Sequence, residues 1–401
     1  MLHRLYFSPG MFGFGRLASY DYFVHLDRAI SERLQARGEL VQTRVLEVSP
    51  TASIRRRAAK LAELVAATCD SDGPGGGPIH LIGHSTGGLD ARLVASPSAS
   101  LGAPPGALEW RSRLASITTI NAPHFGTPLA SFFTTVSGAR VLRALSALTV
   151  LGLSLGSPPL AAVGGLVAAF SRVDRALGLE LAVLDRATDA FLRMLDDARS
   201  NDVRRYVDAI QKDQGAMVQL MPEAMDLFAA GIEDRPGILC QSVASMAPPP
   251  GPRMFLPAFL RPWNVLSAAI FATLYRIAAR YDPRYPCVAP DMSEADEQML
   301  TRAFGRTPGI RENDGVVPLR SQLWGKLVWV GYADHLDVIG HFRDAKPDPR
   351  APGTRGRRDG APPHVDWLYS ASAFDRAGFA SMVDSIVPGL VSSARANSIA
   401  A

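Results

Sequence analysis

The sequence predicts an α/β fold, with one mostly parallel central sheet, helices on both faces and a helical cap or lid inserted into it. Through about residue 121, short apolar runs alternate with helical patterns, as in strand–helix–strand units. From about residue 130 to 235 the pattern is helical with no strand between, which is typical of an insertion above a sheet. We expect one domain over residues 1–401, since enzymes of this class often build large insertions on one sheet.

The individual elements follow from runs of apolar and β-branched residues bounded by turn residues, and from helical periodicity. Strands are expected at 2–8, 41–48, 79–83, 114–121, 237–245 and 326–331. Helices are expected at 17–37, 51–68, 86–95, 257–280 and 373–393. A loop rich in Pro, Gly and Arg, at 342–363, is expected to be flexible and to precede the last helix.

The composition is globular: 47% of residues are hydrophobic and 20% are charged, which leaves ample material for a core. The net charge is +4, and arginines cluster at 55–57 and 355–358. No aromatic residues interleave with them, so we interpret them as solvated and expect no nucleic-acid partner. Of the three cysteines, Cys240 and Cys287 could form a bridge, but free buried thiols are favoured, and no C-x-x-C pair supports zinc.

The N-terminus, MLHRLYFSPGMFGF, lacks the long apolar core of a secretory signal. This favours a cytoplasmic protein, with export by another route left open. Residues 144–171 carry no charge and are long enough to raise a membrane span. Internal glycines and the pair Pro158–Pro159 predict two short helices instead. We interpret this stretch as the apolar part of the cap, suited to transient contact with a lipid surface.

The strongest local signal is the run IHLIGHSTGG, which begins at Ile79 and contains the pattern G-x-S-x-G around Ser85. The run lies between a strand pattern and a helix pattern, where a sharp turn would hold the serine hydroxyl above the sheet edge. Gly83 and Gly87 are needed there because side chains would collide in the turn. The run therefore predicts Ser85 as a nucleophile rather than part of a structural turn.

A serine hydroxyl is a weak nucleophile, so it needs a base that an acid holds in place. Asp314, in the loop NDGVVP, is the candidate acid, and His335, directly after the last expected strand, is the candidate base. The order Ser, Asp, His is the one that this type of fold uses. The other histidines near the motifs or late in the chain are His80, His84, His124, His341 and His364. His80 and His84 are expected to point away from the hydroxyl, His124 to support the site from behind, and His341 and His364 compete with His335.

Attack on an ester leaves negative charge on the carbonyl oxygen, which two backbone N–H groups must meet. One donor is expected at Thr86, directly after the nucleophile. The other is expected at Met11, in the glycine-rich loop that follows the first strand. A solvated turn would hardly carry large apolar side chains, so we expect Phe12 and Phe14 to face the substrate.

Together these motifs resemble bacterial triacylglycerol lipases and esterases of the α/β-hydrolase fold. The matching pieces, in family order, are GMFGF followed by YDYF at 20–23, LIGHSTGGLDAR, NAPHFGTPLA, LMPEAMDLF, ENDGVVP and DHLDVIG. They span nearly the whole chain. The resemblance implies Ser85, Asp314 and His335 as the triad, and Met11 and Thr86 as the oxyanion hole.

The chain also departs from this family. The family has His-Gly at the start of the oxyanion loop, where this chain has Pro9-Gly10, so the supporting hydrogen bonds must differ. The resemblance implies a candidate structural calcium site at Asp337, with Asp291 or Asp296 as the partner ligand. Calcium needs about six oxygen ligands. The chemistry itself requires no cofactor.

The expected function is hydrolysis of carboxylic esters with apolar acyl groups, such as glycerides or aliphatic polyester fragments, through an acyl-enzyme. An acyltransferase or thioesterase with the same triad is one alternative, and the choice of acyl acceptor separates it from a hydrolase. An inactive ligand-binding module of the same fold is another, and it predicts no covalent labelling by a fluorophosphonate.

Overall fold

A computed structural model gives the arrangement of the chain. It describes residues 1–11, 16–17, 20–49, 51–71, 76–136, 138–142, 145–146, 210, 212–255, 262–290, 292–343, 364, 366 and 368–400. The middle of the expected cap and almost all of the expected loop at 342–363 lie outside these residues, so both remain predictions. Phe12 and Phe14 lie outside them as well.

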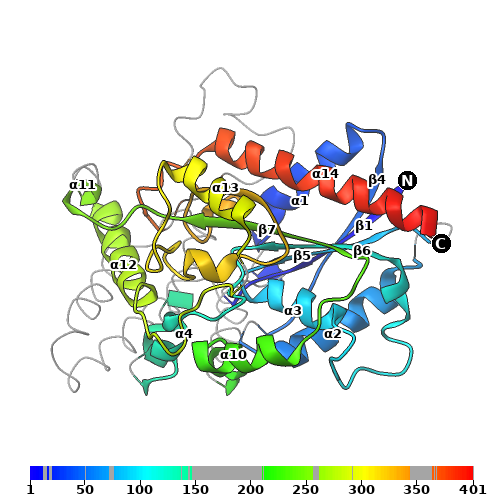
Figure 1. Ribbon diagram of the computed structural model, residues 1–401, viewed down its shortest axis with the longest axis horizontal. Helices are drawn as coiled ribbons and strands as arrows, with labels where there is room; N and C mark the ends of the chain where they lie inside the picture. Colours follow the sequence, from blue (N-terminus) through cyan, green and yellow to red (C-terminus); the bar gives the residue numbers. More distant parts are fainter. Residues whose placement is uncertain are drawn as a thin grey trace, which may run out of the picture.

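Six parallel strands form the central sheet (Figure 1). In spatial order they are β4 (Leu40–Val45), β1 (Leu2–Ser8), β5 (Ile79–His84), β6 (Leu114–Ile120), β7 (Leu239–Met246) and β8 (Lys326–Tyr332). Each neighbouring pair is parallel. The predicted parallel sheet is therefore confirmed, and the chain has an α/β-hydrolase fold.

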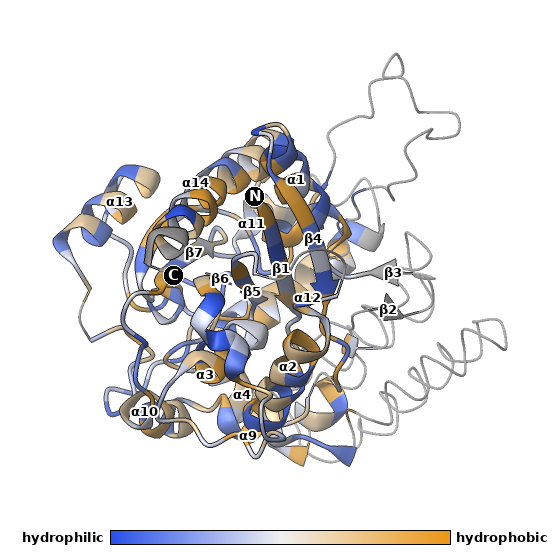
Figure 2. Ribbon diagram, turned by 90° about the vertical axis from the view of Figure 1, so that its right-hand side faces the viewer, coloured by the Kyte–Doolittle hydropathy of each residue, from blue (hydrophilic) through white to orange (hydrophobic). Residues whose placement is uncertain are grey.

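Helices cover both faces of this sheet, which is why its central strands can be apolar on both sides. α1 (Val24–Gln35) and α14 (Arg376–Ala400) lie on one face, and α2 (Ile54–Thr68) and α3 (Thr86–Ala95) lie on the other (Figure 1). All six residues of β5 are buried. The strands and the helix faces that meet them carry much of the hydrophobic colouring in Figure 2.

The remaining elements lie around the ends of the sheet. They are β2 (Arg16–Leu17), β3 (Tyr20–Asp21), α4 (Pro128–Phe133), α9 (Gly215–Gln219), α10 (Pro222–Gly231), α11 (Pro252–Phe255), α12 (Pro262–Ala278) and α13 (Glu294–Phe304), with 3-10 turns η1 (Glu109–Arg113), η3 (Leu319–Gln322) and η4 (Asp337–Ile339).

One expected helix was given the wrong start, and one helix was missed. The helix expected at 17–37 begins only at Val24, because β2 and β3 pair with each other as a short antiparallel ribbon. α13 was not expected at all, although Ser293 and Asp296 form a capping box at its start and Gly305 ends it in the left-handed region. The three cysteines are free, as favoured.

Within the described residues, α14 is long and apolar enough to cross a membrane by length and composition. A stripe of its side chains packs against the sheet instead, with Met382, Val383, Ile386, Val387 and Leu390 fully buried. We therefore interpret α14 as a core helix.

The strand register brings the candidate site residues to one edge of the sheet. Ser8, the last residue of β1, pairs with Gly83 of β5, and His84 pairs with Ile120 of β6. Because all the strands run in one direction, their carboxyl ends meet at this edge, which is where open α/β sheets bind ligands. The loops after these strands carry Met11, Ser85 and Asn121.

Candidate active site

Ser85 lies at the turn between β5 and α3 in a strained backbone conformation, with φ 55° and ψ −129°. Two backbone hydrogen bonds hold it there: the Ser85 N–H donates to the Ile120 carbonyl over 2.9 Å, and the Gly88 N–H donates to the Ser85 carbonyl over 3.0 Å. A Cβ on Gly83 would collide with the Gly87 carbonyl. The turn therefore requires glycine at this position, as the sequence pattern predicts.

Asp314 and His335 lie in direct contact. The His335 Nδ1 is 2.6 Å from Asp314 Oδ2, and the His335 backbone N–H donates to the Asp314 carbonyl over 3.0 Å. Both side chains are almost fully buried. The Asp314 carboxylate accepts four more hydrogen bonds from the N–H groups of Val316 and Val317 on Oδ1 and from the Asn121 and Gln322 amides on Oδ2.

These contacts assign the proton positions on the imidazole. An ionised carboxylate only accepts hydrogen bonds, so His335 Nδ1 must carry a hydrogen and donate it to Asp314. The other ring nitrogen, Nε2, is then the atom with a free lone pair. The His335 ring lies beside the serine turn, with its centroid 4.7 Å from that of His84, the residue before Ser85. Among the hydrogen bonds of the described residues, none joins the Ser85 hydroxyl to this imidazole. Catalytic hydrogen bonds are often long or poorly aligned before substrate binds.

The loop after β1 approaches Ser85 from above. An ideal Cβ on Gly10 would lie 2.7 Å from the Ser85 Cβ and 3.3 Å from its Oγ, so only glycine leaves room there. Met11 follows directly and is 5% exposed. Thr86 is the first residue of α3, and the N–H groups of a first helical turn lack partners within the helix. The structure thus brings both expected oxyanion-hole residues next to the nucleophile.

A buried ion pair supports this loop. Arg57 and Asp90 are fully buried, 2.8 Å apart, and a second guanidinium contact reaches the Pro9 carbonyl. The Ser8 hydroxyl donates to the same carboxylate over 2.7 Å. Burial raises the pKa of Asp90, while the Arg57 charge opposes that rise. The sequence alone did not reveal this pair.

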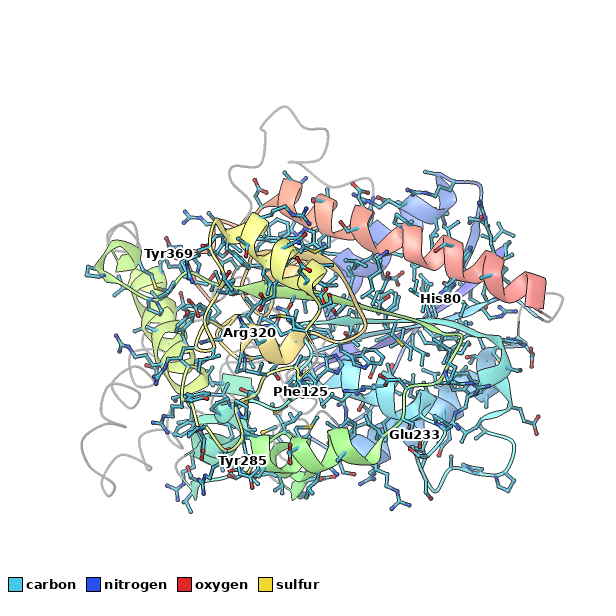
Figure 3. The ribbon with its side chains drawn as sticks, in the orientation of Figure 1. His80, Phe125, Glu233, Tyr285, Arg320 and Tyr369 are labelled. Atoms are coloured by element: carbon cyan, nitrogen blue, oxygen red, sulfur yellow. The ribbon has the colours of Figure 1, made fainter. Side chains whose placement is uncertain are left out.

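The competing histidines are engaged elsewhere. His80 lies on β5 five residues before Ser85, which is about 16 Å along a strand, and Figure 3 shows it well away from Phe125 and Arg320. His124 stacks on Trp324, with ring centroids 5.1 Å apart. His364 Nδ1 bonds the Gly340 carbonyl over 2.7 Å, and the buried His341 contacts the backbone of Tyr22. In the part of the chain that is described, His335 is the histidine on Asp314.

His84 was expected to point away from the site, and its ring does not serve as the base. It is nevertheless part of the site's support, which the sequence did not indicate. Its Nδ1 lies 2.7 Å from the Tyr22 hydroxyl and its Nε2 lies 2.8 Å from the His335 carbonyl oxygen. Burial, together with the neighbouring His335, lowers the pKa of His84 well below its usual value, so the ring is neutral.

The calcium site that the resemblance implied stays a prediction, because Asp291, one of its two candidate partner ligands, lies outside the described residues. Asp337 Oδ2 already accepts hydrogen bonds from the Asp334 N–H and the Ser372 hydroxyl. Asp296, the other candidate, caps α13. No cluster of three His, Cys, Asp or Glu side chains suited to a metal occurs within the described ranges. Burial raises the pKa of Asp334 to about 7 and that of Asp337 well above its usual range.

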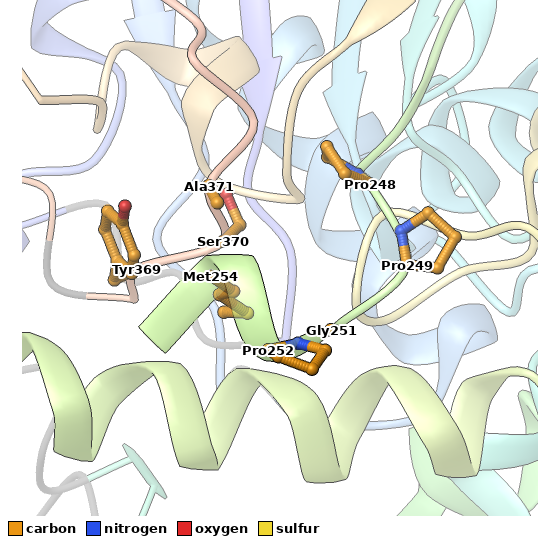
Figure 4. Close-up of a pocket in the computed structure, with 8 residues that line it drawn as sticks. All are labelled: Pro248, Pro249, Gly251, Pro252, Met254, Tyr369, Ser370 and Ala371. Atoms are coloured by element: carbon orange, nitrogen blue, oxygen red, sulfur yellow. The ribbon is translucent and has the colours of Figure 1, made fainter. Parts of the chain in front are cut away.

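An apolar pocket of about 610 Å³ opens close to this region (Figure 4). Its walls come from the loop after β7 and from the segment before α14: Pro248, Pro249, Gly251, Pro252, Met254, Tyr369, Ser370 and Ala371. The Ser370 hydroxyl bonds Asp334, the residue before His335. The pocket therefore adjoins the loop that carries the candidate base.

Comparison with known proteins agrees with the resemblance seen in the motifs. The chain is 33% identical to a triacylglycerol lipase of Vibrio cholerae over 151 residues, which are 37% of this chain and 40% of that lipase. The match thus spans less than half of the relative. No family model matches the chain.

Solved structures of similar proteins include bacterial lipases and esterases. The lipase of Staphylococcus hyicus is 17% identical, with a TM-score of 0.48, over 98% of this chain and 97% of that one. A metagenomic carboxyl esterase, MGS0156, is 15% identical, with a TM-score of 0.46, over 97% of this chain and 75% of that one. At these low identities the fold assignment depends on the strand order and the serine turn described above.

Proposed function

We propose that this protein is a serine hydrolase of carboxylic esters, a lipase or carboxylesterase, with Ser85 as nucleophile, His335 as base and Asp314 as acid. The observation that carries the proposal is the 2.6 Å contact between His335 and Asp314, beside a serine held in a strained strand-to-helix turn. The similarity to the lipase of Vibrio cholerae supports the same class of reaction.

The proton path follows from the hydrogen bonds on the imidazole. His335 Nε2 takes the hydroxyl proton as Ser85 Oγ forms a bond to the ester carbonyl carbon. The carbonyl electrons move onto the oxygen, and Asp314 stabilises the imidazolium. When the tetrahedral intermediate collapses, the C–O bond to the alcohol breaks and His335 returns the proton to the leaving alkoxide. Water then gives a proton to the same nitrogen as it attacks the acyl carbon. The bond to Ser85 Oγ breaks, the carboxylic acid leaves, and His335 returns the proton to Ser85 Oγ.

The backbone N–H groups of Met11 and Thr86 are the proposed donors to the carbonyl oxygen. Charge develops on that oxygen only in the transition state, so donors fixed beforehand stabilise it selectively. The Arg57–Asp90 pair supports this role, because it ties the Pro9 carbonyl and therefore the start of the loop to α2 and α3.

The proposed substrates have apolar acyl groups. The apolar pocket beside the His335 loop supports this preference, and so does the uncharged stretch 144–171, which we propose to contact a lipid surface. Apolar pocket walls exclude water and bind hydrocarbon.

Covalent labelling tests the proposal directly. A fluorophosphonate probe should label the wild-type protein and should not label Ser85→Ala. Ser112→Ala is the matched control, because this serine lies on an exposed turn and bonds only the Glu109 carbonyl. Equal labelling of all three proteins, or of none, would refute the assignment of Ser85.

A hydrolysis profile over p-nitrophenyl esters of rising acyl length then separates the two activities. A rate that increases sharply above the solubility limit of the substrate supports a lipase that acts on lipid surfaces. A preference for short soluble esters supports an esterase. Product formation only when an alcohol is added would indicate an acyltransferase.

A further inference from the structure

We infer that Tyr22 and His84 form a positioning unit that holds the backbone of the catalytic His335 in register with the serine turn and the oxyanion loop, through two consecutive buried hydrogen bonds. The inference rests on the proposed function and adds to it two residues that do not touch the reacting atoms. Neither belongs to the triad or the oxyanion hole.

Three segments that are distant in the sequence meet in this unit. Tyr22 precedes α1, His84 ends β5, and His335 follows β8. The Tyr22 hydroxyl lies 2.7 Å from His84 Nδ1, and His84 Nε2 lies 2.8 Å from the His335 carbonyl oxygen. Tyr22 is 2% exposed, His84 is 0% exposed and His335 is 2% exposed, so water does not compete for these bonds.

The direction of each bond follows from its last acceptor. A carbonyl oxygen only accepts, so His84 Nε2 must carry the hydrogen that it shares with His335. His84 is a neutral imidazole, so its Nδ1 then has a lone pair and accepts, and Tyr22 must donate. The Tyr22 oxygen also lies close to Gly10, whose ideal Cβ would be 3.1 Å from it. A hydrogen bond from the Gly10 backbone to this oxygen opposes the rise in the Tyr22 pKa that burial causes.

The chain of contacts therefore runs from the oxyanion loop through Tyr22 and His84 to the base. His335 is held at three points: its N–H and its Nδ1 on Asp314, and its carbonyl on His84. The first two hold His335 on Asp314, whereas the third ties it to the residue next to Ser85. A tether of this kind fixes the distance between Nε2 and the serine hydroxyl, on which proton transfer depends.

Tyr22→Phe tests the inference, because it removes one oxygen and leaves the buried ring. Tyr6→Phe is the matched control: Tyr6 lies on β1 opposite Leu81, and its hydroxyl bonds Thr68 at the end of α2 over 3.0 Å, so it has no contact with His84 or His335. We expect kcat of Tyr22→Phe to fall about 10- to 100-fold with KM little changed, as a small misplacement of a catalytic group does. Tyr6→Phe should keep the wild-type kcat, and both variants should melt at similar temperatures.

A second pair of variants addresses His84. In His84→Gln the amide can still donate to the His335 carbonyl and accept from Tyr22, whereas His84→Leu can do neither. We expect kcat of His84→Gln to be about tenfold higher than kcat of His84→Leu, because a factor of that size corresponds to one ordinary hydrogen bond. Fluorophosphonate labelling should slow in the same order.

The outcomes separate this inference from the proposed function. An active wild type whose Tyr22→Phe variant matches Tyr6→Phe in kcat would overturn the positioning unit alone, as would a His84→Gln variant no better than His84→Leu. A rise in KM with unchanged kcat would also overturn it, because it would place Tyr22 in substrate binding. A wild type that neither hydrolyses esters nor reacts with the probe would overturn the proposed function itself.

Discussion

Asp314→Asn keeps the shape of the side chain and replaces one acceptor oxygen by a donor, so it tests how strongly the carboxylate controls the base. In the native protein three donors converge on Oδ2, from His335 over 2.6 Å, from Asn121 over 2.9 Å and from Gln322 over 3.3 Å. Two backbone N–H groups, those of Val316 and Val317, occupy Oδ1. Wherever the new NH₂ group lies, it faces a donor.

The arrangement of the Asp314→Asn amide with the lowest free energy leaves His335 unable to act as the base. Backbone N–H groups cannot turn, and each one left buried without an acceptor costs about 1–3 kcal/mol. The NH₂ group should therefore take the Oδ2 position. There the Asn121 and Gln322 amides are also held by Ser245, so His335 must change its tautomer. Its Nδ1 then accepts and Nε2 carries the proton, so it cannot receive the one from Ser85.

We expect kcat of Asp314→Asn to fall about 10³- to 10⁴-fold, which corresponds to about 4–5.5 kcal/mol of transition-state stabilisation. Steady-state hydrolysis of a p-nitrophenyl ester at pH 7–8 measures it. Asp234→Asn is the control, since this half-exposed carboxylate bonds Arg92 and Trp324. A kcat of Asp314→Asn within tenfold of wild type, with the fold intact, would refute the tautomer argument.

Three further changes have defined outcomes. Gly10→Ala places a methyl group 2.7 Å from the Ser85 Cβ, so hydrolysis should fall more than about 100-fold while the melting temperature changes little, and activity near the wild-type level would contradict the assigned loop. Ala371→Gly should raise the free energy of unfolding by about 0.5–1 kcal/mol in urea titrations, because Ala371 has φ 57°, whereas Val391→Ala on α14 should not. Burial lowers the pKa of His80 to about 3, whereas the pKa of histidine in the unfolded chain is about 6.5. The unfolded chain therefore takes up a proton first as the pH falls below 6.5, and the folded state loses about 2 kcal/mol of stability by pH 5. His80→Gln should therefore lose less stability than wild type between pH 7 and pH 5, and parallel curves would contradict this.

Elements buried on both faces were predicted well from the sequence. The strand at 2–8 and the helix at 86–95 have the predicted bounds, and the strand expected at 79–83 extends by one residue to His84. Almost all of their residues are buried, and each element lies between clear turn signals, so the local sequence pattern and the packing indicate the same structure. α13 could have been found as well, since its capping box and its terminal Gly305 are local signals.

The start of α1 could not be placed in this way. The residues before Val24 have helical periodicity, but residues 16–17 and 20–21 pair as a short antiparallel ribbon, and helical periodicity does not reveal a local pairing of this kind. The residues that support the catalytic residues could not be predicted from the sequence either. Ser85, Asp314 and His335 lie in motifs with a recognisable role, whereas Arg57 lies in ordinary helical sequence and Tyr22, although part of the matching piece YDYF, was given no role from the sequence. Their roles depend on contacts across 48 residues to Pro9 and across 62 residues to His84.

Two of the five described non-glycine residues with positive φ lie at the same edge of the sheet. Ser85 and Asn121, each directly after a central strand, have positive φ values of 55° and 47°. Such conformations cost about 1–3 kcal/mol and persist only where surrounding contacts over-determine them. For Asn121 those contacts are a backbone bond to Val243 and amide bonds to Ser245 and Asp314. The strain at Asn121 therefore aims a donor at the candidate acid, while the strain at Ser85 lifts the hydroxyl off the sheet. The fold thus places a residue with positive φ beside both ends of the proposed proton path.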